Sequence, residues 1–417
     1  MTITPIRGKA NANIILDGSK SESNRALMIK YYGALSSEID NLSHSADTML
    51  LNNLLALVDK KHDCVTVIDC ANAGTVLRFM LTALTMKEGR WLLTGDERMC
   101  HRPIGPLVEA LRSIGASVTY RDNDGFPPLI VEGAVINGGN VTVDTDCSSQ
   151  FASSLLLAAP LMQNGLHVHL TGNLSSMPYI DMTIKMMNSF GVNAVRDGLN
   201  ITVPHSKYSN VDYVVNPDWS SAAFWYEIIA IHGDATVMLE NLDMSSPQGD
   251  MAVADFFQQL GVNTICGENG VLLERNEMDV KKIHYDFLNT PDLFPPIAAT
   301  CAALKVDAVF TGIENVTIKE SDRLLAMTTE LKKIGADFEL LSKDILIMKS
   351  PETLPVFEPD NPLKFNTYQD HRIAMALTPL CFKINAVQID SHNIVEKSYP
   401  LFWEDLSKNK FINISDL

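Results

Sequence analysis

The chain has 417 residues, of which 46% are apolar and 20% charged, and its 50 acidic side chains against 33 basic ones give a net charge of −17. This composition indicates a soluble globular protein long enough for two domains, and the acidic surplus disfavours a nucleic-acid partner. No apolar run reaches about eighteen residues and no N-terminal signal pattern is present, so we expect a cytoplasmic protein without a membrane span. The seven cysteines form no CxxC and the ten histidines form no HExxH, which favours free thiols and argues against a metal site.

The first candidate anion-binding segment is Gly18–Arg25 (GSKSESNR), which precedes a helical pattern starting at residue 26. Its glycine, serines and two cations stand where a helix begins. The unpaired N–H groups and positive dipole of a helix start attract phosphate or carboxylate. The segment is not a Walker A loop, because Ser19 separates Gly18 from Lys20 and residue 13 is Asn. Taken alone, it is explained equally well as a polar turn with a serine cap.

Helix ends and strand ends recur along the chain. A glycine suited to a left-handed helix cap, followed by an extended segment, occurs four times, at Gly115, Gly191, Gly261 and Gly335. These glycines are spaced 76, 70 and 74 residues apart. Strands with a common ending precede the last helix of each block, at Ile39, Leu93, Leu170, Leu239, Phe310 and Ile389. The two patterns predict six α/β units of about seventy residues, grouped three and three, and chance similarity of helix ends is the alternative.

Further helix starts in the first half of the chain carry arginines or neutral donors. Gly74 permits close approach of a ligand to the backbone, and Arg78 follows four residues later. Arg102 precedes Pro103, which favours an extended backbone at the arginine and a bidentate pair with an anion. Hydroxyl and amide donors stand at two more helix starts, at Ser148, Ser149, Gln150, Ser176 and Tyr179. Ordinary capping and solvated arginines are the alternatives.

The second half of the chain holds two candidate acid–base groups among cations. Asp292 precedes an apolar helix, for which it is alternatively an N-cap. Lys319 and Arg323 are four residues apart, so on one helix they share a face, with Glu320 beside Lys319. Two cations with a carboxylate between them are suited to bind an anion and move a proton, although an exposed charged helix has the same pattern. Cations thus recur near helix starts in both halves, at Lys20, Arg25, Arg78, Arg102, Lys319, Arg323, Arg372 and Lys397. They predict a cleft for ligands with several negative charges.

Together these segments resemble the 5-enolpyruvylshikimate-3-phosphate synthase family. The likeness rests on Gly-Ser-Lys-Ser-x-Ser-Asn-Arg, Asn-Ala-Gly-Thr-x-x-Arg, Arg-Pro-Ile, Ser-Ser-Gln, Pro-Asp, Lys-Glu-Ser-Asp-Arg, Asp-His-Arg and Glu-Lys-Ser, in the family's order from about residue 5 onward. The resemblance implies an α/β fold of two similar domains, each of three βαβαββ units in an inside-out α/β barrel, with the active site in the cleft between them. It implies an N-terminal domain of 18–216 and a C-terminal domain of 1–17 plus 217–417.

The resemblance also implies a reaction. The enolpyruvyl group of phosphoenolpyruvate is transferred to the 5-hydroxyl of shikimate 3-phosphate through a tetrahedral intermediate, and phosphate is released. This step belongs to the shikimate pathway, which leads to chorismate and the aromatic amino acids. The resemblance implies neither a metal nor an organic cofactor, and we expect a monomer whose partners are small-molecule substrates.

The resemblance assigns the family's binding and catalytic roles to the positions of this chain that match the family's motifs. The residues expected to hold shikimate 3-phosphate are Lys20, Ser21, Arg25, Ser148, Ser149, Ser176, Tyr179, Asp292, Asn315 and Lys319. Those expected to hold phosphoenolpyruvate are Lys20, Gly74, Arg102, Gln150, Arg323, Arg372 and Lys397. Among these, Lys20 is expected to contact both ligands and Asp292 to be the base for the 5-hydroxyl. Glu320 is expected to protonate the methylene carbon and take the proton back as phosphate leaves.

Some positions depart from the family pattern. Asp17 replaces a usual Pro, Glu22 adds a negative charge to the anion loop, Phe79 follows Arg78, and Thr317 replaces an Arg. None of these changes removes a residue assigned to chemistry. We expect the charges of Asp17 and Glu22 to weaken anion affinity.

Two alternatives to this reaction follow from the sequence. The sister transferase that acts on UDP-N-acetylglucosamine has a loop Cys five residues before its Arg-Pro, whereas here Cys100 lies two residues before Arg102. That transferase also lacks the Gly-Ser-Lys-Ser block. A non-catalytic homologue that binds phosphate ligands would keep the cations and lose Asp292 or Glu320, and both are present.

Overall fold

The computed structural model describes residues 1–60, 64–146 and 148–415, and the chain divides into two compact units. One unit is Gly18–Val215, and the other combines Met1–Asp17 with Asn216–Leu417. Each unit has its own hydrophobic core, and the two cores have no residue in common. The six cysteines within the described residues are free thiols, as expected, and Cys147 lies outside those residues.

Within the described part of Gly18–Val215, two four-stranded sheets share one topology, in which a parallel pair is followed by two antiparallel strands. The first sheet has the order β4 (Thr66–Asp69), β5 (Arg90–Thr94), β7 (Leu129–Glu132) and β6 (Ser117–Tyr120). The second has the order β8 (Gly139–Asp144), β9 (Leu166–Thr171), β11 (Asn200–Val203) and β10 (Val195–Asp197). A short parallel pair joins β3 (Ile39–Asp40) to β12 (Tyr213–Val214).

The other unit repeats this topology in three sheets. The first has the order β2 (Ala10–Ile15), β13 (Ala235–Glu240), β15 (Gly270–Arg275) and β14 (Val262–Gly267). The second has the order β16 (Lys282–Asp286), β17 (Asp307–Thr311), β19 (Ile345–Lys349) and β18 (Asp337–Ser342). The third has the order β20 (Leu363–Phe365), β21 (Val387–Ile389), β1 (Thr2–Pro5) and β22 (Ile412–Ser415). The N-terminal strands β1 and β2 complete two of these sheets, which explains why Met1–Asp17 belongs to this unit.

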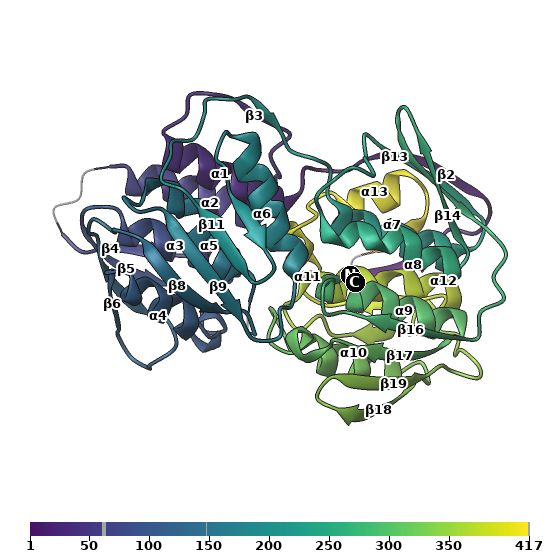
Figure 1. Cartoon of the computed structure of the whole chain (residues 1–417). Helices are drawn as coiled ribbons and strands as arrows, with labels where there is room; N and C mark the ends of the chain where they lie inside the picture. The colour runs from purple at the N-terminus through teal and green to yellow at the C-terminus, as the bar shows by residue number, and fades with distance from the viewer. Residues whose placement is uncertain (61–63, 147, 416–417) are drawn as a thin grey trace. The chain divides into compact units, whose positions relative to one another are not determined.

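Each unit contains inner helices that pack on one another (Figure 1). The inner helices are α1 (Lys20–Gly33), α3 (Gly74–Thr85) and α5 (Gln150–Ala158) in one unit, and α7 (Trp219–His232), α9 (Phe294–Leu304) and α11 (His371–Leu377) in the other. The remaining helices are α2 (Ala46–Val58), α4 (Gly105–Ser113), α6 (Met177–Ser189), α8 (Val253–Gln259), α10 (Arg323–Lys332), α12 (Cys381–Ile384) and α13 (Phe402–Lys408). Helix α9 has no charged residue and is buried along nearly its whole length, as expected for a helix that is apolar on all sides.

The repeat predicted from the sequence is confirmed. The glycines at 115, 191, 261 and 335 all have positive φ, at 101°, 83°, 77° and 95°. Only glycine adopts this backbone readily, so the helix ends there and a strand follows. The six predicted strand ends lie in β3, β5, β9, β13, β17 and β21, and each of these strands belongs to a parallel pair.

The inner helices begin at residues predicted to bind anions. Helices α1, α3 and α5 start at Lys20, Gly74 and Gln150, and Arg372 is the second residue of α11. The fold therefore places the predicted site at the starts of buried helices. None of the described helices is long and apolar enough to cross a membrane.

Candidate active site

The start of α1 carries the predicted anion-binding lysine. Ser19 caps the helix, and its Oγ accepts a hydrogen bond from the Glu22 N–H at 3.5 Å. The Nζ of Lys20 lies 3.2 Å from Oδ2 of Asp47 in the first turn of α2. Both side chains are mostly buried, so this ion pair fixes the ammonium group at the helix start.

Arg25 clamps three helices of the same unit together. Its guanidinium group donates to the Ser21 carbonyl at 2.8 Å, to Thr183 Oγ1 at 2.7 Å, and to Ser153 Oγ and the Tyr179 carbonyl at 3.2 Å each. These partners lie on α1, α5 and α6. Burial lowers the pKa of Arg25 to about 10, which leaves the group charged at neutral pH. The arginine therefore brings positive charge close to Ser21 and Tyr179, both predicted ligands.

Two further guanidinium groups converge on the start of α3. A methyl group added to Gly74 would lie 2.6 Å from Nη1 of Arg78 and 2.6 Å from Nη1 of Arg102. Arg102 is only 8% exposed, and within the described part of the chain its Nε and Nη1 have no hydrogen-bond partner. Its backbone is extended, with φ −91° and ψ 130°, as expected before Pro103. Buried donors without a partner are costly, so this cluster is prepared for an anion.

The starts of α5 and α6 hold the predicted neutral donors. Ser148 Oγ accepts the Gln150 N–H at 3.2 Å, and Ser149 is buried beside it. Gln150 Nε2 donates to Thr75 Oγ1 at 2.8 Å and so joins the start of α5 to that of α3. Ser176 has a left-handed backbone, with φ 58° and ψ 33°, which is uncommon for serine and typical of functional positions.

The Gly74 cluster makes a testable prediction. Gly74→Ala is expected to raise the KM for an anionic substrate by about tenfold, because the methyl group displaces the guanidinium ends and weakens charge-assisted hydrogen bonds. The thermal midpoint should stay near that of the wild type, since only flexible side-chain ends must move. Gly267→Ala is the matched control, because its methyl group would meet nothing closer than a backbone oxygen at 3.8 Å. An unchanged KM in Gly74→Ala would contradict the placement of an anion here.

Arg323 is the centre of a polar network in the other unit. It is the first residue of α10 and its side chain is 1% exposed. Three carboxylates accept hydrogen bonds from its guanidinium group, Asp292 at 2.7 Å, Glu320 at 2.8 Å and Asp370 at 2.8 Å. Burial opposes the charge, but the three carboxylates outweigh burial and raise the pKa of Arg323 above its usual value. The guanidinium group therefore stays charged and is held in three directions.

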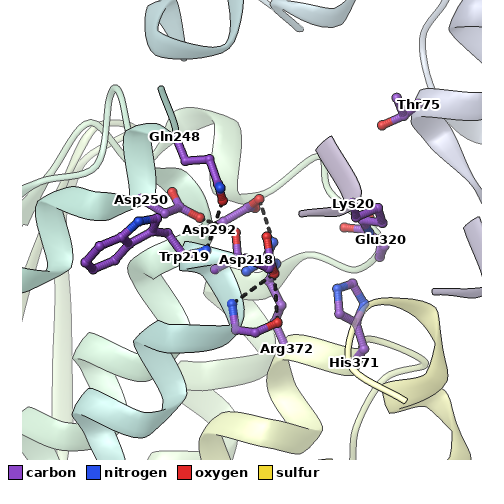
Figure 2. A network of polar contacts seen from close by, with 12 residues as sticks. Lys20, Thr75, Asp218, Trp219, Gln248, Asp250, Asp292, Glu320, His371 and Arg372 are labelled. Carbon is purple, nitrogen blue, oxygen red and sulfur yellow. Dashed lines mark hydrogen bonds and ion pairs between the residues drawn. The ribbon is translucent and has the colours of Figure 1, made fainter. Parts of the chain in front are cut away.

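Asp292 lies between the guanidinium groups of Arg323 and Arg372. Figure 2 draws its side chain near that of Arg372. Its Oδ1 accepts a hydrogen bond from Arg323 at 2.7 Å, and its Oδ2 is 3.0 Å from Nη2 of Arg372. Burial opposes ionisation of the carboxyl, but Arg372, Lys319 and Arg323 outweigh it and hold its pKa below the usual range. The residue at the N-cap of α9 is Leu293, so the alternative in which Asp292 is that N-cap is wrong.

One detail predicted for the second half of the chain is wrong. Lys319 and Arg323 do not share a helix face, because Asp322 caps α10 and its Oδ1 accepts the Leu325 N–H at 3.0 Å. The helix starts at Arg323, so Lys319 and Glu320 lie on the preceding turn. Glu320 still reaches Arg323, and its side chain is 16% exposed, which leaves this carboxylate accessible.

The other predicted residues also lie on turns. Asn315 belongs to the 3₁₀ turn Glu314–Val316, and Lys397 ends the turn His392–Lys397 with 4% of its surface exposed. Across the described residues, no three His, Cys, Asp or Glu side chains are grouped to hold a metal ion.

Comparison with known proteins identifies the family. The sequence model of EPSP synthase (3-phosphoshikimate 1-carboxyvinyltransferase) matches residues 5–406. The chain belongs to this family. It is 39% identical over 405 residues to the 3-phosphoshikimate 1-carboxyvinyltransferase of Bacteroides fragilis (strain ATCC 25285), with 96% of this chain and 95% of that protein covered. It is 34% identical over 429 residues to that of Sulfurovum sp. (strain NBC37-1), with 97% and 98% covered.

A solved structure supports the fold of an EPSP synthase. The EPSP synthase of Acinetobacter baumannii is 22% identical in sequence, and the two chains match over 100% of both with a TM-score of 0.77. The predicted α/β class and the resemblance stated from the sequence motifs are thus confirmed. The UDP-N-acetylglucosamine transferase and the non-catalytic homologue are not favoured by these matches.

Several acidic residues of the candidate site do not stand out in the sequence. Asp370 is fully buried, and its Oδ1 accepts the Arg372 N–H at 3.0 Å while its Oδ2 accepts from Ser321 Oγ at 3.0 Å. Asp47 holds Lys20, and Asp250 lies in the network around Arg372. Each of these aspartates lies at a helix start or in a turn, where an aspartate usually caps a helix. Only their neighbours in the folded chain show that they belong to the site and are not ordinary caps.

Proposed function

We propose that this chain transfers the enolpyruvyl group of phosphoenolpyruvate to the 5-hydroxyl of shikimate 3-phosphate and releases phosphate. The observation that carries this proposal is the pair of carboxylates, Asp292 and Glu320, bound to one guanidinium group, that of Arg323. Addition of a hydroxyl to an enol ether needs a base for the hydroxyl and an acid for the carbon, on separate groups. The cations around them are suited to substrates that carry phosphate and carboxylate.

We assign the unit Gly18–Val215 to the recognition of both anions. Shikimate 3-phosphate is held by hydroxyls and cations at the starts of α1, α5 and α6, namely Lys20, Ser21, Arg25, Ser148, Ser149, Ser176 and Tyr179. Phosphoenolpyruvate is held at the starts of α3 and α5 by Lys20, Gly74, Arg102 and Gln150. The partnerless donors of Arg102 support the second assignment. These contacts orient two anions that repel each other.

The unit Met1–Asp17 with Asn216–Leu417 supplies the chemistry. Asp292, Asn315 and Lys319 contact shikimate 3-phosphate, and Arg323, Arg372 and Lys397 contact phosphoenolpyruvate. We propose that the two units are the family's two domains, 18–216 and 1–17 plus 217–417. A reaction that uses groups of both units requires both to reach the same substrates.

The reaction balances as an addition followed by an elimination. Asp292 takes the proton of the 5-hydroxyl as its oxygen bonds to C2 of phosphoenolpyruvate, while Glu320 gives a proton to C3 and forms a methyl group. Glu320 then takes a proton back from that methyl group as the C2–O bond to phosphate breaks. The hydroxyl proton that Asp292 accepted leaves with the phosphate, and the cations stabilise the negative charge on that departing group. This scheme uses no cofactor, and the expected monomeric state and cytoplasmic location stay predictions.

The test is phosphate release from phosphoenolpyruvate, measured with and without shikimate 3-phosphate. Release that depends on shikimate 3-phosphate and is lost in Glu320→Gln is the expected result. Release that depends instead on UDP-N-acetylglucosamine would overturn the substrate assignment. Binding of both ligands without release would overturn the assignment of a reaction.

A further inference from the structure

Asp250 is a buried carboxylate beside Asp292 that has no role in the proposed reaction. Asp250 lies in the 3₁₀ turn Gly249–Ala252 and is 2% exposed. The hydroxyl of Ser220, in the first turn of α7, donates to its Oδ2. Its Oδ1 has no hydrogen-bond partner within the described part of the chain. A buried carboxyl with one unbonded oxygen is costly, so a stabilising role for it in folding is a poor explanation.

The turn that carries Asp250 is fixed to the start of α7. Gln248 donates to the Pro217 carbonyl at 2.8 Å. It also accepts the Trp219 N–H at 2.9 Å (Figure 2). The cap of α7 is already provided by Asp218, whose Oδ2 accepts the Ser221 N–H at 3.0 Å. Asp250 is therefore not needed as the helix cap, and Gln248 fixes the turn that carries it.

The charged groups that face Asp250 come from several elements. Figure 2 draws it beside Asp292, and Arg372 and Asp218 also act on it. Tyr285 on β16 is a further titratable neighbour. Burial and then Asp292 raise the pKa of Asp250 to about 6, against the opposite effect of Arg372 and of the Ser220 hydroxyl. The charge of Asp250 thus changes near neutral pH, whereas Asp292 stays ionised.

We propose that Asp250 is a positioning residue whose buried negative charge beside Asp292 strengthens Asp292 as a base. This inference rests on the proposed function. In the free protein the cations make Asp292 a weak base, because they stabilise its ionised form. When phosphoenolpyruvate engages those cations, the negative charge of Asp250 remains beside Asp292. That charge favours transfer of the 5-hydroxyl proton to Asp292.

Asp250→Asn tests the inference, because the amide keeps the size of the side chain and still accepts from Ser220. We expect kcat to fall on the order of tenfold at about pH 8, since Asp292 becomes a weaker base. The KM for phosphoenolpyruvate should fall or stay level, because one negative charge is lost near the anion. The ratio of wild-type to variant kcat should approach one as the pH falls well below about 6, because the wild-type carboxyl is then protonated. Comparing the two proteins at each pH cancels the titration of the substrates.

Two further variants keep the inference falsifiable. Ser220→Ala removes a hydrogen bond that favours the ionised form of Asp250, so at about pH 6, where this carboxyl titrates, it should lower kcat by about threefold. Glu227→Gln is the matched control, because Glu227 is a fully buried carboxyl on α7 whose oxygens have no hydrogen-bond partner in the described residues. It should leave the pH profile of kcat unchanged.

The outcomes separate this inference from the proposed function. An Asp250→Asn variant whose kcat ratio is the same at every pH, or whose KM rises while kcat is unchanged, would overturn the role of Asp250. A wild-type protein that releases no phosphate in the presence of shikimate 3-phosphate would overturn the proposed function and the inference with it.

Discussion

Replacing Asp292 with Asn is expected to lower kcat for phosphate release by about a thousandfold, the range in which a general base contributes. The KM for phosphoenolpyruvate should not rise. The amide keeps the shape of the side chain, and the loss of its charge leaves Arg323 and Arg372 more attractive to an anion. Steady-state phosphate release at varied phosphoenolpyruvate, with shikimate 3-phosphate saturating, measures both constants.

The control for this variant is another paired carboxylate of the same unit. Asp307 is 2.9 Å from Lys349 near the surface, and Asp307→Asn should change neither kcat nor KM appreciably. An Asp292→Asn variant with normal kcat and a strongly raised KM would show that Asp292 binds substrate without acting as the base. Normal values of both constants would remove it from the site.

The architecture could be predicted because its signals are local. A left-handed helix end requires glycine, so Gly115, Gly191, Gly261 and Gly335 mark the units from the sequence alone. The pairing of β3 with β12 could not be foreseen, because both strands are only two residues long and lie far apart in the sequence. Pairing at that distance has no local pattern.

The sequence singles out the cations of the candidate site, but it does not single out the carboxylates that pair with them. Lys20 and Arg102 lie in the distinctive motifs Gly-Ser-Lys-Ser and Arg-Pro-Ile. Asp47 and Asp370 instead look like ordinary helix caps in the sequence. Their roles arise only when the fold brings them to Lys20 and Arg323. The turn before α10 was wrongly assigned to a helix because a spacing of four residues suggests a shared face, whereas the cap at Asp322 starts the helix later.

The conservative variant Arg323→Lys is expected to lower kcat/KM for phosphoenolpyruvate by about a thousandfold, although the positive charge is kept. The planar guanidinium group bonds Asp292, Glu320 and Asp370 at once, and a single ammonium group cannot reproduce that geometry. Asp370 is fully buried, so the loss of its partner should also destabilise the protein by about 2 kcal/mol. Kinetics and thermal unfolding of the same preparation measure the two effects.

The exposed pair of Arg196 with Asp181 provides the control, because it is also bidentate, at 2.7 and 3.0 Å, but lies in solvent. Arg196→Lys should change stability by less than about 1 kcal/mol and leave activity intact. If Arg323→Lys were as mild as this control, the three carboxylates would not depend on guanidinium geometry. If it lost stability but kept kcat/KM, Arg323 would only hold the fold, and the paired acid and base would have to be aligned by Arg372 instead.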